Sequence, residues 1–171
     1  MRGERDADFI GYVEGRMPTF RRMAYLLCHD WDQADDLVQT SLAKLYSARS
    51  RLPEVGNADA YVRRIILRSF LDDRRRFWRR EVPTEVLPEH GHRTPSHGVE
   101  DRLVLMQALR HLPARQRAVV VLRCWEDLSV AETAGVLGCS EGAVKTHLSR
   151  GLAALRIALV PSGSTLEGHK Q

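Results

Sequence analysis

The stretch of residues 128–155 constrains the fold most, because it holds the start and stop signals of two short helices joined by a tight turn. Ser129 and Glu132 have the spacing of a capping box, in which each side chain bonds an amide left open at a helix start. Gly138 stands where a helix end needs a residue that accepts left-handed backbone angles. Ser140 offers a second N-cap. The stretch therefore predicts a helix, a sharp turn and a second helix.

The second helix of this stretch has two different faces. Apolar side chains recur on one face at helical spacing: Val144, Leu148, Leu152, Leu155 and Leu159. Short polar and basic side chains fall on the opposite face: Lys145, Thr146, Ser149 and Arg150. This division is that of a helix-turn-helix, whose second helix lies in the major groove of DNA. An ordinary helical hairpin with a solvated basic face is the alternative, but the two caps, the glycine and the spacing together favour DNA binding.

The positive charge of the chain is concentrated in one segment. The 171 residues carry a formal net charge of +4, which by itself says little. Residues 63–80 hold eight arginines against two aspartates, a net charge of +6, whereas residues 1–62 have a net charge of −2. A polyanion is therefore expected to meet the chain at this segment.

The basic segment belongs to a long predicted helix in which Val62 and Ile66 follow the apolar side. Tyr61, Phe77 and Trp78 lie among its arginines. Arginines near aromatic rings suit single-stranded nucleic acid, because guanidinium groups track phosphates while rings stack on unpaired bases. A solvated, helix-favouring arginine face is the alternative, and the charge balance elsewhere favours nucleic-acid binding.

Helical spacing continues through the rest of the chain, and strand signals are almost absent. We expect residues 6–28 to form one helix, or two helices broken near Pro18, and Asp32 to cap a second helix. Asn57 or Asp59 should cap the basic helix. The expected fold class is all-α.

Residues 82–98 divide the chain, since they contain three prolines, two glycines and three histidines without an apolar period. We expect a flexible linker there, between small helical domains at residues 1–81 and 99–160, the second of which holds the helix-turn-helix. Residues 161–171 should form a disordered polar tail. His90, His92 and His97 lack a nearby cysteine or a rigid scaffold, so we expect no metal site.

Other functional classes find little support in the sequence. Cys28, Cys124 and Cys139 are far apart and odd in number, which favours buried reduced thiols. No phosphate loop, HExxH motif or nucleophile elbow is present, so we expect no catalytic residues and no enzyme. Neither a signal peptide nor an apolar run of about 18 residues is found, which predicts a cytoplasmic protein.

Three stretches of the chain together resemble a known family: DWDQADDLVQTSLAKLY, NADAYVRRIILRSFLDDRRR, and LPARQRAVVVLRCWEDLSVAETAGVLGCSEGAVKTHLSRGLAAL. Their order and spacing are similar to those of the extracytoplasmic-function (ECF) sigma factors, the small two-domain specificity subunits of bacterial RNA polymerase. The resemblance covers roughly residues 7–158 and is strongest to the actinobacterial sigma-E-like group. It implies an alternative sigma factor that binds core RNA polymerase and directs promoter-specific initiation of transcription.

The resemblance also implies a role for each stretch. The first would bind core polymerase through Asp35, Asp36, Leu37 and Gln39. The second would recognise and melt the −10 element through Asn57, Tyr61, Arg64, Arg68, Arg74, Arg75 and Arg76. The third would contact the −35 element through Lys145, Thr146, Ser149 and Arg150.

The partners implied are core RNA polymerase and promoter DNA, duplex at −35 and opened at −10, with an anti-sigma factor as a further possibility. No cofactor, small-molecule substrate or membrane insertion is implied, because the polymerase holds the metal and performs the chemistry. Thr40, Ala143 and His147 depart from the family's usual acidic residue, threonine and arginine, which leaves the promoter sequence open.

Two other classes of protein compete with this interpretation. A LuxR-type helix-turn-helix regulator, which acts without being a polymerase subunit, would fit the stretch EGAVKTHLSRGLAAL nearly as well. Such a protein normally begins with a βαβ receiver, and the first hundred residues show no strand pattern. An RNA-binding or structural helical protein would explain the arginines but not the paired caps.

Overall fold

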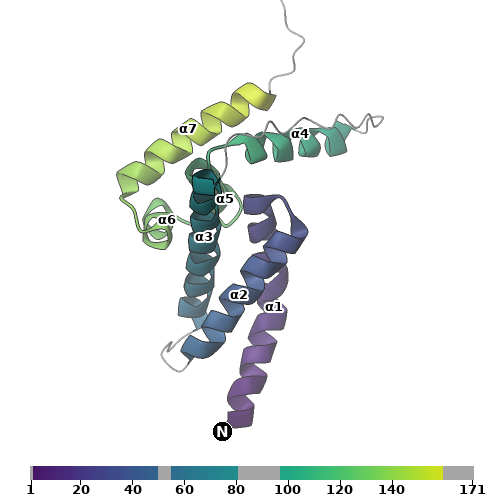
Figure 1. Cartoon of the computed structure of the whole chain (residues 1–171), viewed down its shortest axis with the longest axis vertical. Helices are drawn as coiled ribbons and strands as arrows, with labels where there is room; N and C mark the ends of the chain where they lie inside the picture. Colours follow the sequence, from purple (N-terminus) through teal and green to yellow (C-terminus); the bar gives the residue numbers. More distant parts are fainter. Residues whose placement is uncertain (1, 50–54, 81–96, 160–171) are drawn as a thin grey trace, which may run out of the picture.

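The computed structural model describes the backbone of residues 2–49, 55–80 and 97–159, and the side chains of residues 6–49, 58–73 and 101–159. These ranges contain seven α-helices and no strand (Figure 1). In chain order they are α1 (Arg2–Cys28), α2 (Trp31–Ala48), α3 (Val55–Arg80), α4 (His97–His111), α5 (Ala114–Cys124), α6 (Val130–Leu137) and α7 (Glu141–Leu159). The all-α fold class is confirmed.

The N-terminal half consists of α1, α2 and α3, with α2 packed against both of the others (Figure 1). α1 runs through Pro18 as one helix, so the alternative of two helices broken there is wrong. Phe20 and Met23, which follow the proline, are almost fully buried. Their packing in the core holds the helix together across a residue that would otherwise favour a break.

The start of α2 differs from the sequence prediction. Asp30, and not Asp32, is the N-cap, and its carboxylate accepts a hydrogen bond of 2.9 Å from the backbone N–H of Gln33. His29 adopts a φ of 60°, which turns the chain sharply between α1 and α2. This short turn starts α2 two residues earlier than expected, and Asp32 lies in its first turn, where a negative charge favours the helix dipole.

The sequence suggested Asn57 or Asp59 as the N-cap of α3, but neither residue lies at the start of the helix. The helix begins at Val55, so both Asn57 and Asp59 lie inside it. Asp59 is 9% exposed, and its carboxylate accepts a hydrogen bond of 2.7 Å from the Tyr12 hydroxyl. It also pairs with Arg16 of α1. Asp59 therefore connects α3 to α1 through a cluster of charged and polar side chains that is partly withdrawn from solvent.

The C-terminal half confirms the predicted helix-turn-helix. The Ser129 hydroxyl accepts from the N–H of Glu132, whose carboxylate accepts from the N–H of Ser129, and this hydrogen bonding lowers the pKa of Glu132. Gly138 ends α6 with a φ of 64°. Ser140 caps α7 by accepting a hydrogen bond of 3.1 Å from the N–H of Ala143. α5 and α4 pack against α7 from the side facing the core.

A close approach between α5 and α7 depends on Gly151. A Cβ atom added there would lie 2.8 Å from Val120 Cγ2. We expect Gly151→Ala to lower the free energy of unfolding by about 1–3 kcal/mol, because the overpacked helices must move apart. Urea denaturation of the full chain measures the change.

Gly135 provides the matched control for this substitution. It is an exposed residue of α6, where an added Cβ would meet no described atom within 4 Å. Gly135→Ala should therefore raise the free energy of unfolding, by about 0.4–1 kcal/mol, through a less flexible unfolded chain. Equal effects of the two substitutions would contradict the close approach.

The two halves of the chain share one hydrophobic core. α1 contacts α4 and α5, and α3 contacts α5 and α6. Arg117 of α5 is 2% exposed and donates hydrogen bonds to the backbone oxygens of Leu27, at the end of α1, and of Arg110 and Leu112, around the end of α4. Burial, together with the nearby Arg117 and Arg110 cations, lowers the pKa of His29 in this interface to about 4. The interface between the halves is therefore well packed and contains a buried cation.

The cysteines agree only in part with the expected buried thiols. Cys28 is buried at the end of α1, and burial raises the pKa of its thiol. Cys124, by contrast, is exposed at the end of α5, and Cys139 is half-buried. All three are free cysteines. No helix in the described ranges is both long and apolar enough to cross a membrane.

Candidate nucleic-acid interface

The outer face of α7 carries the four side chains that the sequence assigned to DNA contact. Lys145, Thr146, Ser149 and Arg150 are all exposed. On the inner face Val144 is fully buried and Leu155 is 6% exposed. Leu159, which the spacing placed in the same apolar stripe, is 42% exposed instead, at the last residue of α7. α7 therefore presents a polar and basic face over its first turns.

The exposed face of α3 carries a second set of predicted residues. Tyr61, Arg64 and Arg68 are three and seven residues apart, so they lie on one side of the helix, and both arginines are exposed. Arg64 also donates a hydrogen bond of 3.2 Å to the backbone oxygen of Gly135 in α6. The side chains of Asn57, Arg74, Arg75 and Arg76 lie outside the described part of the chain.

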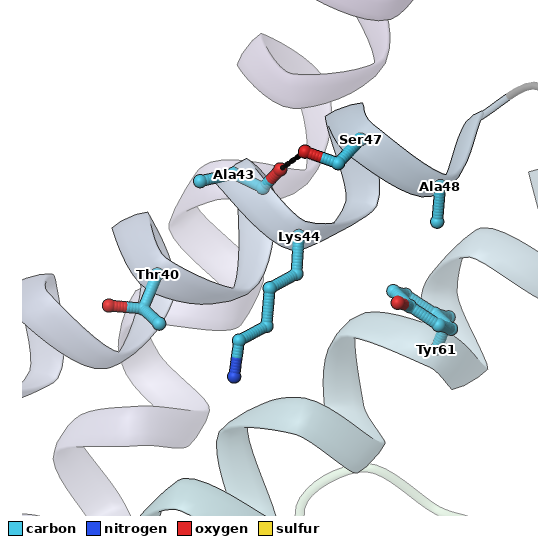
Figure 2. Close-up of a pocket in the computed structure, with 6 residues that line it drawn as sticks. All are labelled: Thr40, Ala43, Lys44, Ser47, Ala48 and Tyr61. Carbon is cyan, nitrogen blue, oxygen red and sulfur yellow. Dashed lines mark hydrogen bonds between the residues drawn. The ribbon is translucent and has the colours of Figure 1, made fainter.

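A hollow of about 550 Å³ lies between α2 and α3, next to Tyr61. Its walls mix hydroxyl, methyl, ammonium and aromatic groups: Thr40, Ala43, Lys44, Ser47, Ala48 and Tyr61. Figure 2 shows Lys44 extending from α2 toward the space in front of α3, while Tyr61 lies opposite Ala48. A flat ring and a cation beside an open hollow can accept a planar polar group and an anion.

Sequence reasoning identified Tyr61 but missed the α2 side of this hollow. Thr40, Lys44 and Ala48 are spaced four apart, a spacing that puts them on one helix face. This helix face indicates a binding hollow only when the position of α3 is known, because Tyr61 of α3 forms the opposite wall. The sequence alone shows an ordinary exposed helix surface.

The acidic residues of α2 are placed differently from one another. Asp36 and Gln39 are exposed, as a contact with another protein requires. Asp35 already receives two hydrogen bonds from Arg21, at 2.5 and 3.0 Å, and this bonding raises the pKa of Arg21. Leu37 is 5% exposed and packs in the core. The structure thus separates the four predicted residues into two exposed side chains, one ion-paired side chain and one core side chain.

Two family models match the chain, and together they span both halves. Sigma-70 region 2 matches residues 13–80, which run from within α1 to the end of α3, and Sigma-70 region 4 matches residues 102–155, which cover the helix-turn-helix. The chain is 42% identical over 157 residues to the RNA polymerase sigma-E factor of Streptomyces coelicolor, covering 90% of this chain and 86% of that protein. The chain belongs to the sigma-70 family.

More distant relatives place this sigma factor in the ECF group. It is 31% identical over 143 residues to the RNA polymerase sigma factor SigV of Bacillus subtilis, with 82% of this chain and 84% of that protein covered. It is 30% identical over 135 residues to the ECF RNA polymerase sigma factor SigM of Mycobacterium tuberculosis, with 78% and 68% covered. The expected sigma-E-like resemblance is confirmed, and nothing supports the LuxR-type alternative.

Solved structures agree with the arrangement of the whole sigma factor. The sigma factor RpoE of Bartonella quintana, solved in complex with the anti-sigma factor NepR, superposes with a TM-score of 0.71 at 26% identity. The match covers 91% of this chain and 98% of that chain. CnrH, solved with the cytosolic domain of CnrY, has the same fold with a TM-score of 0.63 at 22% identity and coverages of 90% and 88%.

Proposed function

We propose that this ECF sigma factor binds core RNA polymerase and positions it on promoters through two separate DNA-binding surfaces. One observation carries the proposal: a single chain holds a capped helix with an exposed basic face and, apart from it, a basic helix bordering an open hollow. The first surface suits a duplex groove and the second suits an unpaired strand. A protein with both can hold one promoter element while another is opened.

The −35 element is assigned to α7. Lys145 and Arg150 can donate hydrogen bonds to guanine O6 and N7 in the major groove, whereas Thr146 and Ser149 can contact bases or phosphates. α5 and α6 support this assignment, since they fix the buried face of α7 and leave these four side chains in solvent. Ala143 and His147, which are half-buried in the same helix, depart from the family's usual threonine and arginine and leave the preferred base sequence open.

The opened −10 strand is assigned to the face of α3 that carries Tyr61, Arg64 and Arg68. The two guanidinium groups would track phosphates, and an unpaired base would enter the hollow beside Tyr61 and Lys44. The other residues predicted to contact the −10 element lie in the same helix, before and after this face: Asn57, Arg74, Arg75 and Arg76. The charge of residues 63–80 supports this assignment.

Core polymerase is assigned to the exposed face of α2 around Asp36 and Gln39. The acidic side chains of this face would repel phosphate, so protein is a better partner for it than DNA. Leu37 would contribute to polymerase binding indirectly, because its packing in the core holds α2 in place. Asp35 would contribute through its hydrogen bonds with Arg21, which fix α2 against α1. We further propose that the protein acts in the cytoplasm, performs no chemistry of its own and is regulated by an anti-sigma factor, as relatives solved with such partners suggest.

The polymerase assignment predicts a specific loss of binding. Replacing Asp36 and Gln39 together by alanine should weaken the affinity for core RNA polymerase at least about tenfold, because central contacts of an interface contribute about 1–2 kcal/mol each. Both side chains are exposed, so the fold should survive. Affinity is measured by titrating labelled core enzyme with the full chain in the absence of DNA.

The matched control is Asp101→Ala with Gln107→Ala, which removes the same residue types from the exposed surface of α4. The control should bind core polymerase nearly as the natural chain does. If both double variants have unchanged affinity, the assignment of α2 is wrong. If neither they nor the natural chain binds core polymerase, the proposed function itself is wrong.

A further inference from the structure

An ion pair connects the helix-turn-helix half of the chain to the long basic helix. Arg63 Nε of α3 lies 2.9 Å from Glu126 Oε2, in the segment between α5 and α6. Both side chains are largely withdrawn from solvent, at 14% and 9% exposed. Water competes weakly at such a site, so a charge-assisted hydrogen bond there holds its two elements more firmly than a surface pair does.

A second contact lies beside this pair. The Arg64 guanidinium donates to the Gly135 oxygen of α6, and α6 packs on α3 around it. Arg64 belongs to the α3 face that the proposed function assigns to the opened strand. In the observed arrangement the helix-turn-helix half therefore borders this face and engages one of its donors.

The N-terminal half holds Arg63 in position independently of Glu126. Asp59, one turn earlier in α3, lies 3.8 Å from Arg63, and it is itself held by Tyr12 and Arg16 of α1. Separation of the two halves would thus break the bond to Glu126 and leave Asp59 as an anion near Arg63. Arg63 therefore has an anionic neighbour both before and after separation, which is what a contact that opens and closes requires.

We propose that the Arg63–Glu126 pair is an intramolecular latch, which keeps α6 over the strand-binding face of α3 and must open before that face takes up a DNA strand. The proposal rests on the proposed function in one respect, the assignment of α3 to the opened strand. While the latch is closed, Arg64 donates to Gly135. Once it opens, the same guanidinium is available to a phosphate, which accepts from arginine more strongly than a neutral carbonyl does.

The latch is tested with Glu126→Gln, which keeps the shape of the side chain and removes its charge. Asp127→Asn is the matched control, since Asp127 is the exposed neighbour with a φ of 51°, a conformation that asparagine tolerates. Both variants add one positive charge to the chain, so a general gain in DNA attraction would be equal in the two. Circular dichroism of each full chain confirms the helical fold.

Two readouts are compared among the natural chain and the variants. Hydrogen–deuterium exchange should become faster in α6 and in residues 58–68 of α3 for Glu126→Gln only. The affinity for a fluorescein-labelled single-stranded oligothymidine, measured by anisotropy without polymerase, should rise about three- to tenfold for Glu126→Gln only, because a larger fraction of molecules is competent to bind.

Equal behaviour of the two variants in both readouts would overturn the latch. Faster exchange without a gain in strand affinity would show that the halves separate but that α6 does not cover a strand-binding face of α3. That result would also overturn the latch. Neither readout uses RNA polymerase, so failure of the latch is distinguishable from failure of the proposed function, which is decided by core binding and transcription.

Discussion

Replacing Arg117 by methionine should lower the free energy of unfolding by about 2–4 kcal/mol, a large loss for a domain of this size. The guanidinium donates to the backbone oxygens of Leu27, Arg110 and Leu112 and lies 5.7 Å from the Phe70 ring centre. Methionine fills much of the space but donates no hydrogen bond, so three carbonyl groups lose a charged donor. Removing the buried cation offsets part of this loss, which sets the upper limit of the range.

Arg115→Met is the control for this experiment, because Arg115 is an exposed residue of the same helix. It should change the free energy of unfolding by no more than about 0.5 kcal/mol. Urea denaturation followed by circular dichroism gives both values. A loss for Arg117→Met as small as that of the control would show that the interface between the two halves does not depend on this side chain.

Replacing Arg150 by alanine should weaken binding to the matching −35 element by about 1–3 kcal/mol, which corresponds to a loss of roughly five- to 150-fold. Arg150 projects from the exposed face of a helix whose opposite face is buried, so it can reach base edges without distortion of the fold. Binding of the holoenzyme to promoter fragments is measured on a matched and a scrambled upstream element. Apart from a slight weakening shared by both templates through the lost charge, the loss should appear on the matched element alone.

Arg156→Ala removes the same charge from the last turn of α7 and serves as the control. It should weaken binding to both templates slightly and equally, because the loss of one charge acts through phosphates. If Arg150→Ala also weakens both templates equally, α7 grips the DNA backbone and does not select sequence. The helix-turn-helix would then bind DNA as proposed, but the assignment of base recognition to Arg150 would be wrong.

The parts of the fold that follow local rules could be predicted from the sequence. The capping box of Ser129 and Glu132 and the left-handed Gly138 depend on residues within one helical turn, and the structure contains both. The start of α2 was displaced because two aspartates, Asp30 and Asp32, can each cap a helix, and the choice between them depends on the turn at His29. Local patterns do not contain that information.

Contacts between distant segments could not be predicted. Asp59 was predicted as a cap from its position near the start of the basic helix. Its actual partners, Tyr12 and Arg16, are 47 and 43 residues away in the sequence, so local patterns do not reveal them. Arg117 lies within the third of the family-like stretches, but one of its acceptors, the oxygen of Leu27, is 90 residues away in the sequence. Such side chains look like ordinary surface charges until the helices are assembled.

The same distinction applies to the candidate site. Exposure of Lys145 and Arg150 follows from helical periodicity, so it could be predicted, whereas the hollow between α2 and α3 needs two helices and was missed. Leu37 matched the family motif and is 5% exposed in the core, a placement that the motif by itself does not indicate. Their roles in binding remain predictions.

Run-off transcription with purified core RNA polymerase tests the central claim most directly. Core enzyme free of other sigma factors is incubated with genomic DNA fragments, with and without the full chain, and thymine reactivity to permanganate is recorded near each start site. Our account predicts discrete transcripts and opened thymines only when the chain is present, and their loss with the Asp36→Ala, Gln39→Ala variant. A correctly folded chain that binds core polymerase but yields neither discrete transcripts nor opened DNA on any fragment would contradict it.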